Sequence, residues 1–351
     1  MEFAFTEEQE MIAETVNGFF AEHATSERTR AAMAGEGIDR ALWGAFCTEL
    51  GMAGVAVPEA LGGAGLGLVE LAIVAQAAGG QVAAVPLLGH AMVARALAAG
   101  GSAQQQAQWL PQLLSGAAIA AFAQAETVTE AGGALSLVAD FVAHGALADL
   151  FLVAAGKGAW LVERNAAGLS VSAHVTMDQT RPLATLALAG TRAQELADPA
   201  AALAAARATG WIVAAAEALG GAQACLDRTV AYARERVQFG RPIGSFQAYK
   251  HRLADMMIEI EQARSAVYWA ACALDEGSDE APLALHAAKS FAADTFFMCA
   301  GNMIQLHGGI GFTWEHDAHL FFKRARALQS MLGNGNWHRE RIAGMILGDA
   351  A

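Results

Sequence analysis

The sequence predicts a mainly α-helical protein with a small β-domain in its middle. Apolar residues recur at helical spacing over residues 1–117 and again over residues 196–351. Between them, residues 118–195 carry short runs of Val, Leu and Phe that Gly, Asn and Asp separate, a pattern typical of antiparallel strands. We therefore predict three domains with these boundaries: an N-terminal helical domain, a β-domain and a C-terminal helix bundle.

In the N-terminal region, Thr6 and Gln9 have the spacing of a capping box, which predicts that the first helix starts there. The stretch Val57–Gly67 is too rich in glycine for regular structure, so we interpret it as a tight turn between helices, with phosphate binding as the weaker alternative. The helices expected in this region are Thr6–Ala21, Asp39–Leu50, Leu68–Ala78, Leu87–Ala99 and Ala103–Leu114.

The middle and C-terminal regions give equally distinct patterns. The expected strands are Ala118–Ala123, Leu135–Ala143, Leu150–Ala155, Ala159–Val162, Leu169–His174 and Leu183–Leu188. The expected C-terminal helices are Asp198–Glu235, Phe246–Glu276, Pro282–Leu306, Glu315–Met331 and Trp337–Leu347. Gly220 and Gly221 lie inside the first of these helices, where the missing side chains would let neighbouring backbones approach closely.

The composition permits a large core and argues against a nucleic-acid-binding surface. Hydrophobic residues make up 55% of the chain, and the net charge is −13. An anionic substrate would therefore need local basic groups that work against the overall field. The four cysteines lie in apolar helical patterns without a Cys-x-x-Cys pair, which predicts buried thiols in a reducing cytoplasm.

No targeting segment or membrane span is expected from the sequence. Met1–Phe5 lacks the basic and apolar regions of a signal peptide. The most apolar run, Trp211–Ala224, is interrupted by Glu217 and two glycines, and it is shorter than the roughly 20 apolar residues that a span requires.

A cationic corner, Arg236–Gln247, joins the first two C-terminal helices. Gly240 is expected to cap the first helix in the left-handed conformation, Pro242 prevents its continuation, and Ser245 is the expected N-cap of the second. On spacing alone, the corner is a helix hairpin with solvated arginines.

The corner also resembles the acyl-CoA dehydrogenase family, in which an Arg-x-x-Phe-Gly turn is followed by Ile, Gln and Leu-Ala-Asp-Met. A second match is Gln305–Phe312, with the sequence Gln-Leu-His-Gly-Gly-Ile-Gly-Phe. The resemblance covers nearly the whole chain. It implies that the two pieces meet across a subunit interface and hold the pyrophosphate and adenosine of FAD, and that the middle domain is a shortened β-barrel.

The resemblance implies a set of FAD contacts, each with a structural alternative. The Arg236 guanidinium would bind the diphosphate, or it would only complement a helix C-terminus. Phe239 would pack on the cofactor, or belong to the core. The glycines of the second motif would let a ligand approach, or only stop a helix. The implied contacts are Arg236, Gln238, Phe239, Gln247, Gln305, Gly308, Gly309, Asn334 and Asn336.

No metal site is predicted. His316 and His319 flank Asp317, but no third ligand follows at a fitting spacing. His307, inside the second motif, is expected to be a solvated histidine.

The catalytic base of the family is missing. The resemblance places Leu332 at the usual position of the glutamate, and Gly210 at the alternative position. Glu217, two turns beyond Gly210, is either a displaced base or a buried, paired carboxylate, and we favour the paired carboxylate. Contacts to the flavin ring are also depleted near Ala125 and Val142–Gly145.

This pattern resembles subunits of heteromeric acyl-CoA dehydrogenases, including those that act on steroid side chains and rings. The first hypothesis is a flavoenzyme subunit that contacts FAD held largely by a related partner chain, with acyl-CoA as substrate and an electron-transferring flavoprotein as acceptor. The second is a homotetrameric acyl-CoA dehydrogenase with a relocated base such as Glu217. The third is a non-catalytic scaffold subunit that binds no flavin.

Overall fold

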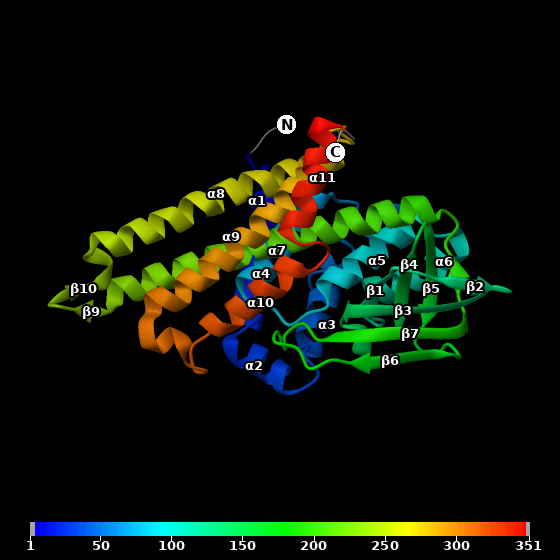
Figure 1. Cartoon of the computed structure of the whole chain (residues 1–351), viewed down its shortest axis with the longest axis horizontal. Coiled ribbons are helices and arrows are strands. Elements are labelled where there is room, and N and C mark those ends of the chain that lie inside the picture. Colours follow the sequence, from blue (N-terminus) through cyan, green and yellow to red (C-terminus); the bar gives the residue numbers. More distant parts are fainter. Residues whose placement is uncertain (1–3, 349–351) are drawn as a thin grey trace. The chain divides into compact units, whose positions relative to one another are not determined.

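The computed structural model describes residues 4–348. Helices come first, strands occupy the middle and helices return, so the predicted fold class is confirmed (Figure 1). The α-helices are α1 Glu7–His23, α2 Ser26–Ala34, α3 Arg40–Thr48, α4 Leu68–Gly80, α5 Leu87–Gly100, α6 Ala103–Leu114, α7 Pro199–Glu235, α8 Gln247–Asp275, α9 Ala281–His307, α10 Ala318–Ser330 and α11 Gly335–Leu347. The strands are β1 Ala120–Ala125, β2 Thr129–Ala131, β3 Ala134–Ala143, β4 Leu150–Ala155, β5 Gly158–Glu163, β6 Leu169–Ala173, β7 Leu183–Arg192, β8 Gln194–Glu195, β9 Val237–Gln238 and β10 Arg241–Pro242.

The described chain divides into two compact units. The first combines α1, α4 and the part of the chain from Trp211 onward. The second contains α3, α5, α6 and strands β1–β8, together with most of α2 and the start of α7. The three-domain boundaries at residues 117 and 195 stay a prediction.

The β region consists of two four-stranded sheets, in the orders β1-β4-β5-β8 and β2-β3-β7-β6. Phe151 and Trp160 from the first sheet and Leu186 from the second belong to one buried hydrophobic cluster. The prediction of a wholly antiparallel domain is wrong, because β1 and β4 pair in parallel, with Ala120 opposite Leu150. The chain passes through β2 and β3 before it returns, and this long connection allows β4 to run in the same direction as β1.

The predicted cap at the start of α1 is confirmed, whereas the one predicted for α8 is wrong. Thr6 Oγ1 accepts a hydrogen bond from the Gln9 backbone N–H (3.2 Å), and the Gln9 side chain accepts one from the Thr6 N–H (3.1 Å), so the predicted capping box is confirmed. Ser245 is not the N-cap of α8. It ends a short 3₁₀ helix, η4 Ile243–Ser245, and Phe246 takes the cap position without a side-chain hydrogen bond.

The glycine-rich stretch Val57–Gly67 is a turn, as predicted. Gly62 and Gly65 have positive φ angles of 86° and 69°. Gly63 lies so close to the Val57 carbonyl that an added Cβ would be 2.1 Å from the oxygen. These contacts explain the glycines without a ligand.

Helix α7 is the long core helix of the C-terminal region. By length and composition it could cross a membrane, but 72% of its most apolar window is buried inside the structure, and a core helix meets the same criteria. Two glycines bring it close to α4: a Cβ on Gly220 would lie 1.9 Å from the Gln76 carbonyl oxygen, and one on Gly79 would lie 2.1 Å from that of Glu217. The predicted close approach at Gly220 is therefore confirmed.

The four cysteines are free thiols. Cys47, Cys225 and Cys299 are buried, whereas Cys272 is half-buried. Burial raises the pKa of Cys47 to about 12, which makes this thiol a poor nucleophile at neutral pH.

The close approach of α4 and α7 predicts a severe effect of one methyl group. Gly220→Ala should destabilise the protein by about 1–3 kcal/mol or more, because the Gln76 backbone cannot yield as a flexible side chain would. Gly301→Ala in α9 is the matched control. Nothing lies within 4 Å of its added Cβ, so this change should stabilise the helix by about 0.5–1 kcal/mol. Urea unfolding of both variants measures these free energies. Equal changes in the two variants would contradict the close approach at Gly220.

Candidate functional site

The corner between α7 and α8 is a β-hairpin and not a capped helix end. β9 and β10 pair antiparallel, and the two residues between them, Phe239 and Gly240, have φ angles of 53° and 76°. Two consecutive left-handed residues are typical of a type I′ turn. The predicted role of Gly240 as the helix cap is therefore wrong, since α7 already ends at Glu235.

The predicted cofactor contacts on this hairpin face outward. Phe239 is 91% exposed, so it is not a core aromatic residue. Its ring meets that of Phe246 edge-on, and the Arg241 guanidinium lies over the Phe246 ring at 4.0 Å. Arg236 is exposed too, and no described group forms a hydrogen bond or ion pair with its guanidinium. Gln238 and Gln247 are also exposed.

The structure brings the hairpin and the second motif together at one end of the α8–α9 pair (Figure 1). The Tyr249 hydroxyl, in the first turn of α8, donates to the Leu306 carbonyl at 3.0 Å. Tyr232 stacks on His307, with ring centroids 4.5 Å apart. These two contacts tie the corner to the end of α9 within one chain.

His307 is buried, with 4% of its surface exposed, so the prediction of a solvated histidine is wrong. Its Nδ1 donates to the Met303 carbonyl at 2.7 Å, and the Tyr232 ring covers one face. Burial lowers the pKa of His307, which favours the neutral ring. The residue therefore supports the motif from inside.

The glycines of the second motif have two different roles. They follow α9 as the 3₁₀ helix η5 Gly308–Phe312. A Cβ on Gly308 or Gly309 would meet nothing within 4 Å, and Gln305 beside them is exposed. A Cβ on Gly311 would lie 2.6 Å from the Ile304 carbonyl oxygen, so this glycine serves packing. Gly308 and Gly309 leave open space at the surface.

Leu332, at the predicted base position, lies in a strained turn. It has a φ of 56°, and Gly333 follows with 97°. A left-handed leucine costs about 1–2 kcal/mol, so its surroundings must hold it. One support is the Trp211 indole N–H, which donates to the Leu332 carbonyl at 3.0 Å. An indole of α7 therefore packs at this position, and Leu332 offers no group that could accept a proton.

Two neutral histidines contact the Trp211 ring. The Nδ1 atoms of His286 and His338 are 2.7 Å apart, and Trp211 contacts both rings. Burial lowers the pKa of His286 and lowers that of His338 to about 3, with further lowering at His338 by the charge of Lys289. Since one Nδ1 must donate and the other accept, the two neutral rings share one hydrogen bond, whereas the buried Nε2 of His338 has no hydrogen-bond partner within the described residues.

Glu217 is a buried, paired carboxylate, as we favoured. Its Oε1 lies 2.5 Å from Nη1 of Arg324 in α10, and the two side chains are 7% and 2% exposed. Arg324 is among the largest fully buried side chains of the described chain. A carboxylate held this way would have to break its ion pair before it could serve as a base.

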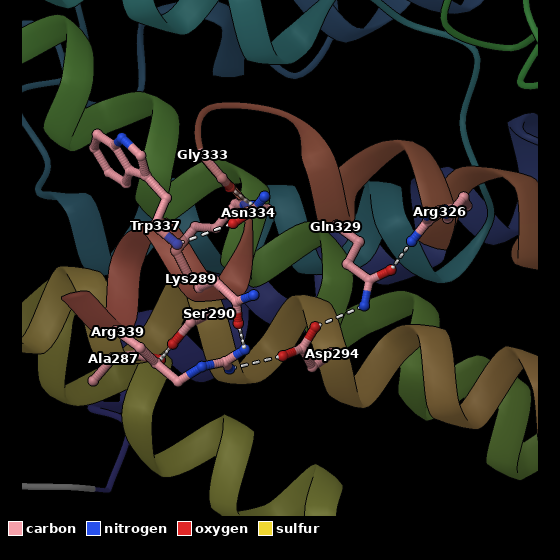
Figure 2. Close-up of polar contacts among 11 residues, drawn as sticks. Ala287, Lys289, Ser290, Asp294, Arg326, Gln329, Gly333, Asn334, Trp337 and Arg339 are labelled. Carbon is pink, nitrogen blue, oxygen red and sulfur yellow. Dashed lines mark hydrogen bonds and ion pairs between the residues drawn. The ribbon is translucent and has the colours of Figure 1, made fainter. Parts of the chain in front are cut away.

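Asn334 and Asn336 line a separate cavity of about 250 Å³ between α9, α10 and α11. Figure 2 shows Asp294 between Gln329 and Arg339, which donate to its two oxygens at 2.7 Å and 3.0 Å. The cavity is lined by Asp294, Arg326, Gln329, Ser330, Asn334, Gly335, Asn336 and Arg339.

The predicted cofactor contacts therefore form two groups in one chain. Lys289 of α9 contacts the Gly333 carbonyl beside the cavity, whereas His307 ends the same helix at the hairpin. The helical rise of about 1.5 Å per residue puts roughly 27 Å between these two points. The hairpin group and the asparagine group lie at different places along α9.

The histidines considered for a metal have other partners. Asp317 accepts hydrogen bonds from Ser26 (2.5 Å) and Arg228 (3.1 Å). His316 Nδ1 accepts from the Ala318 N–H, and His319 Nε2 donates to the Trp314 carbonyl. Within residues 4–348, no group of three metal-ligating side chains is found.

Comparisons with known proteins agree over nearly the whole chain. Residues 201–347 match the family model "Acyl-CoA dehydrogenase, C-terminal domain", and residues 6–117 match "Acyl-CoA dehydrogenase, N-terminal domain". Acyl-CoA dehydrogenase IpdE2 of Mycobacterium tuberculosis is 42% identical over 327 residues, which is 93% of each chain.

Two solved structures have the same fold over the full length. The Tcur3481-Tcur3483 steroid ACAD, in variant form, is 33% identical with a TM-score of 0.91, covering 98% of this chain and 99% of that one. The ChsE4-ChsE5 complex from Mycobacterium tuberculosis is 30% identical with a TM-score of 0.91, covering 100% of both.

The buried ion pair predicts strongly non-additive mutations. Arg324→Met should cost about 3–5 kcal/mol of folding free energy, because it leaves the Glu217 charge buried and without this partner. The double variant Glu217→Gln/Arg324→Met should recover part of that loss. A double-mutant cycle by urea unfolding measures the coupling. If the free-energy changes of the two single variants add up to that of the double variant within about 0.5 kcal/mol, the two side chains do not stabilise each other.

Proposed function

Because the chain belongs to the acyl-CoA dehydrogenase family of flavin-dependent oxidoreductases, we propose that it is one subunit of a heteromeric FAD-dependent acyl-CoA dehydrogenase. One observation carries the proposal: the hairpin that would contact FAD is intact and exposed, whereas the predicted base position holds Leu332, whose backbone carbonyl accepts a hydrogen bond from Trp211. In this proposal a related partner chain supplies the base and most of the remaining flavin contacts.

The hairpin has the chemistry that a dinucleotide diphosphate requires. Arg236 offers a guanidinium without a competing carboxylate, and guanidinium binds phosphate through paired N–H donors. Gly308 and Gly309 leave space for the ligand to reach the backbone. All these groups are exposed, so a second chain would have to cover a cofactor bound here. This supports contact with an FAD that a neighbouring subunit holds.

The cavity at Asn334 and Asn336 also suits an anion. Its side-chain oxygens already accept internal hydrogen bonds: Asn334 Oδ1 from the Trp337 N–H and Asn336 Oδ1 from Arg339. Gln329 Oε1 accepts from Arg326 in the same way. The lining also contains two guanidiniums, those of Arg326 and Arg339, against one carboxylate, that of Asp294, so positive charge exceeds negative charge there. Such a cavity fits phosphate oxygens better than a cation.

The reaction divides into a hydride and a proton transfer. When bound, FAD would supply the acceptor for the hydride of the acyl thioester's β-carbon. A carboxylate must take the α-proton, and Leu332 cannot. Glu217 is engaged by Arg324, which argues against a relocated base in a homotetramer. This chain would then bind and orient cofactor while the partner accepts the proton.

The relatives support a two-chain assembly and an acyl-CoA from lipid breakdown. One relative is a complex of two chains, and another is described as a steroid enzyme. We further propose that the enzyme is tetrameric, passes electrons to an electron-transferring flavoprotein, and works in the cytoplasm without spanning a membrane. The free cysteines suit a reducing compartment.

A visible spectrum of the purified chain, alone and with its partner subunit, tests the assembly. We expect a colourless chain that becomes yellow with the partner and is bleached by acyl-CoA. A yellow chain that acyl-CoA bleaches without a partner would support the homotetramer instead. A chain that stays colourless with every related partner would support the scaffold.

The cofactor contact is tested by Arg236→Ala. Charge-assisted hydrogen bonds contribute about 1.5–3 kcal/mol each, so the affinity of the assembled protein for FAD should fall by at least about tenfold. Arg234→Ala is the matched control, because it removes the same charge from the same helix end. If FAD titration gives equal affinities for both variants, Arg236 only complements the helix C-terminus.

The missing base is tested by two further variants. Leu332→Glu should give little activity in the isolated chain, because the flavin contacts are also incomplete. Glu217→Gln should leave turnover of the assembled enzyme within about tenfold, whereas loss of a general base typically costs about 10²–10⁴. Steady-state acyl-CoA oxidation measures both. A hundredfold loss in Glu217→Gln, with the unfolding midpoint in urea unchanged, would identify Glu217 as the base.

A further inference from the structure

A buried lysine holds the turn at the base position from inside. Lys289 of α9 is fully buried, and its Nζ donates to the Leu328 carbonyl at 2.9 Å and to the Gly333 carbonyl at 2.8 Å. Leu328 lies in the last turn of α10, whose final carbonyls lack helical partners. One ammonium therefore joins both ends of the segment that contains Leu332.

The two carbonyls lie directly before residues that line the cavity at Asn334 and Asn336. Leu328 precedes Gln329, and Gly333 precedes Asn334, which caps α11 by accepting a hydrogen bond from the Trp337 N–H (Figure 2). A displacement of either peptide would shift a wall of the cavity. The strained φ of Leu332 also requires such support, because a left-handed leucine does not persist unless its surroundings hold it.

From this geometry we infer that Lys289 is a positioning residue for FAD: it fixes the Gln329 and Asn334 walls of the cavity without touching the cofactor. The inference rests on the proposed function. It assigns a role in cofactor affinity to a side chain that binds only backbone carbonyls.

The charge of Lys289 gives the inference a pH signature. Burial lowers the pKa of Lys289 to about 8, and Asp294 on the same helix opposes the shift. His338 on α11 is another ionisable neighbour, because the Lys289 charge lowers its pKa, and His286 on α9 pairs with it. The charge of Arg341 on α11 acts on both histidines, and their lowered pKa values leave them neutral above pH 7. Lys289 is charged below pH 8 and neutral above it. The hydrogen bonds from Lys289 to the two carbonyls should therefore weaken as the pH rises from 7 to 9.

The test is a titration of FAD into the deflavinated assembly. Flavin fluorescence reports binding, and thermal unfolding is measured in parallel. Lys289→Met should weaken FAD binding by about tenfold at pH 7, with the affinity determined well below its unfolding temperature. The wild type should lose about threefold or more of its affinity between pH 7 and pH 9. Lys289→Arg should restore binding without this pH dependence, because arginine stays charged. The exposed Lys157→Met is the control and should match the wild type.

The outcomes separate this inference from the proposed function. If Arg236→Ala weakens FAD binding but Lys289→Met does not, the positioning role is wrong while the proposed function stands. The positioning role is also wrong if Lys289→Met lowers the unfolding temperature without weakening FAD binding. Unchanged binding in both variants would overturn both. If Lys289→Met does not fold, the wild-type profile decides, and a flat affinity from pH 7 to 9 would overturn the inference.

Discussion

The close packing of α7 against its neighbours is the constraint on which the C-terminal region depends. Gly79 and Gly220 let α4 and α7 approach until backbone meets backbone, and the buried Glu217–Arg324 pair ties α7 to α10. A carboxylate and a guanidinium in this interior are stable only together. The packing that makes α7 a core helix therefore also engages Glu217, the residue considered as a relocated base.

Much of the fold could be predicted because it depends on local periodicity and capping. The Thr6–Gln9 box set the start of α1, and the pattern from Ala103 to Leu114 matched α6 at both ends. The parallel pairing of β1 with β4 could not be predicted, because strand direction depends on the whole connection between them. The type I′ turn was missed because Phe239, a bulky residue with positive φ, is rare at such a position.

The candidate site was predictable in its motifs but not in its supports. The spacing of Arg236 and of Gly308 and Gly309 showed where a ligand could approach. It did not show that His307 is buried under the Tyr232 ring. Nor did it show that Lys289 binds the carbonyls of Leu328 and Gly333, which lie 39 and 44 residues further along the chain. Contacts of this kind join residues that no local pattern relates, so only the tertiary structure reveals them.

The arrangement is compatible with the proposal that this chain retains its predicted cofactor contacts without a base of its own. The hairpin group and the cavity group are separated by roughly 27 Å of α9, so each is supported by its own contacts: Tyr232 and Tyr249 at one end, Lys289 at the other. Leucine at position 332 leaves both sets of contacts intact. In the proposed heteromer, the hairpin would serve the FAD of a neighbouring chain whose own base is present. Loss of the base here would then leave the hairpin under selection, because the partner's reaction still depends on it.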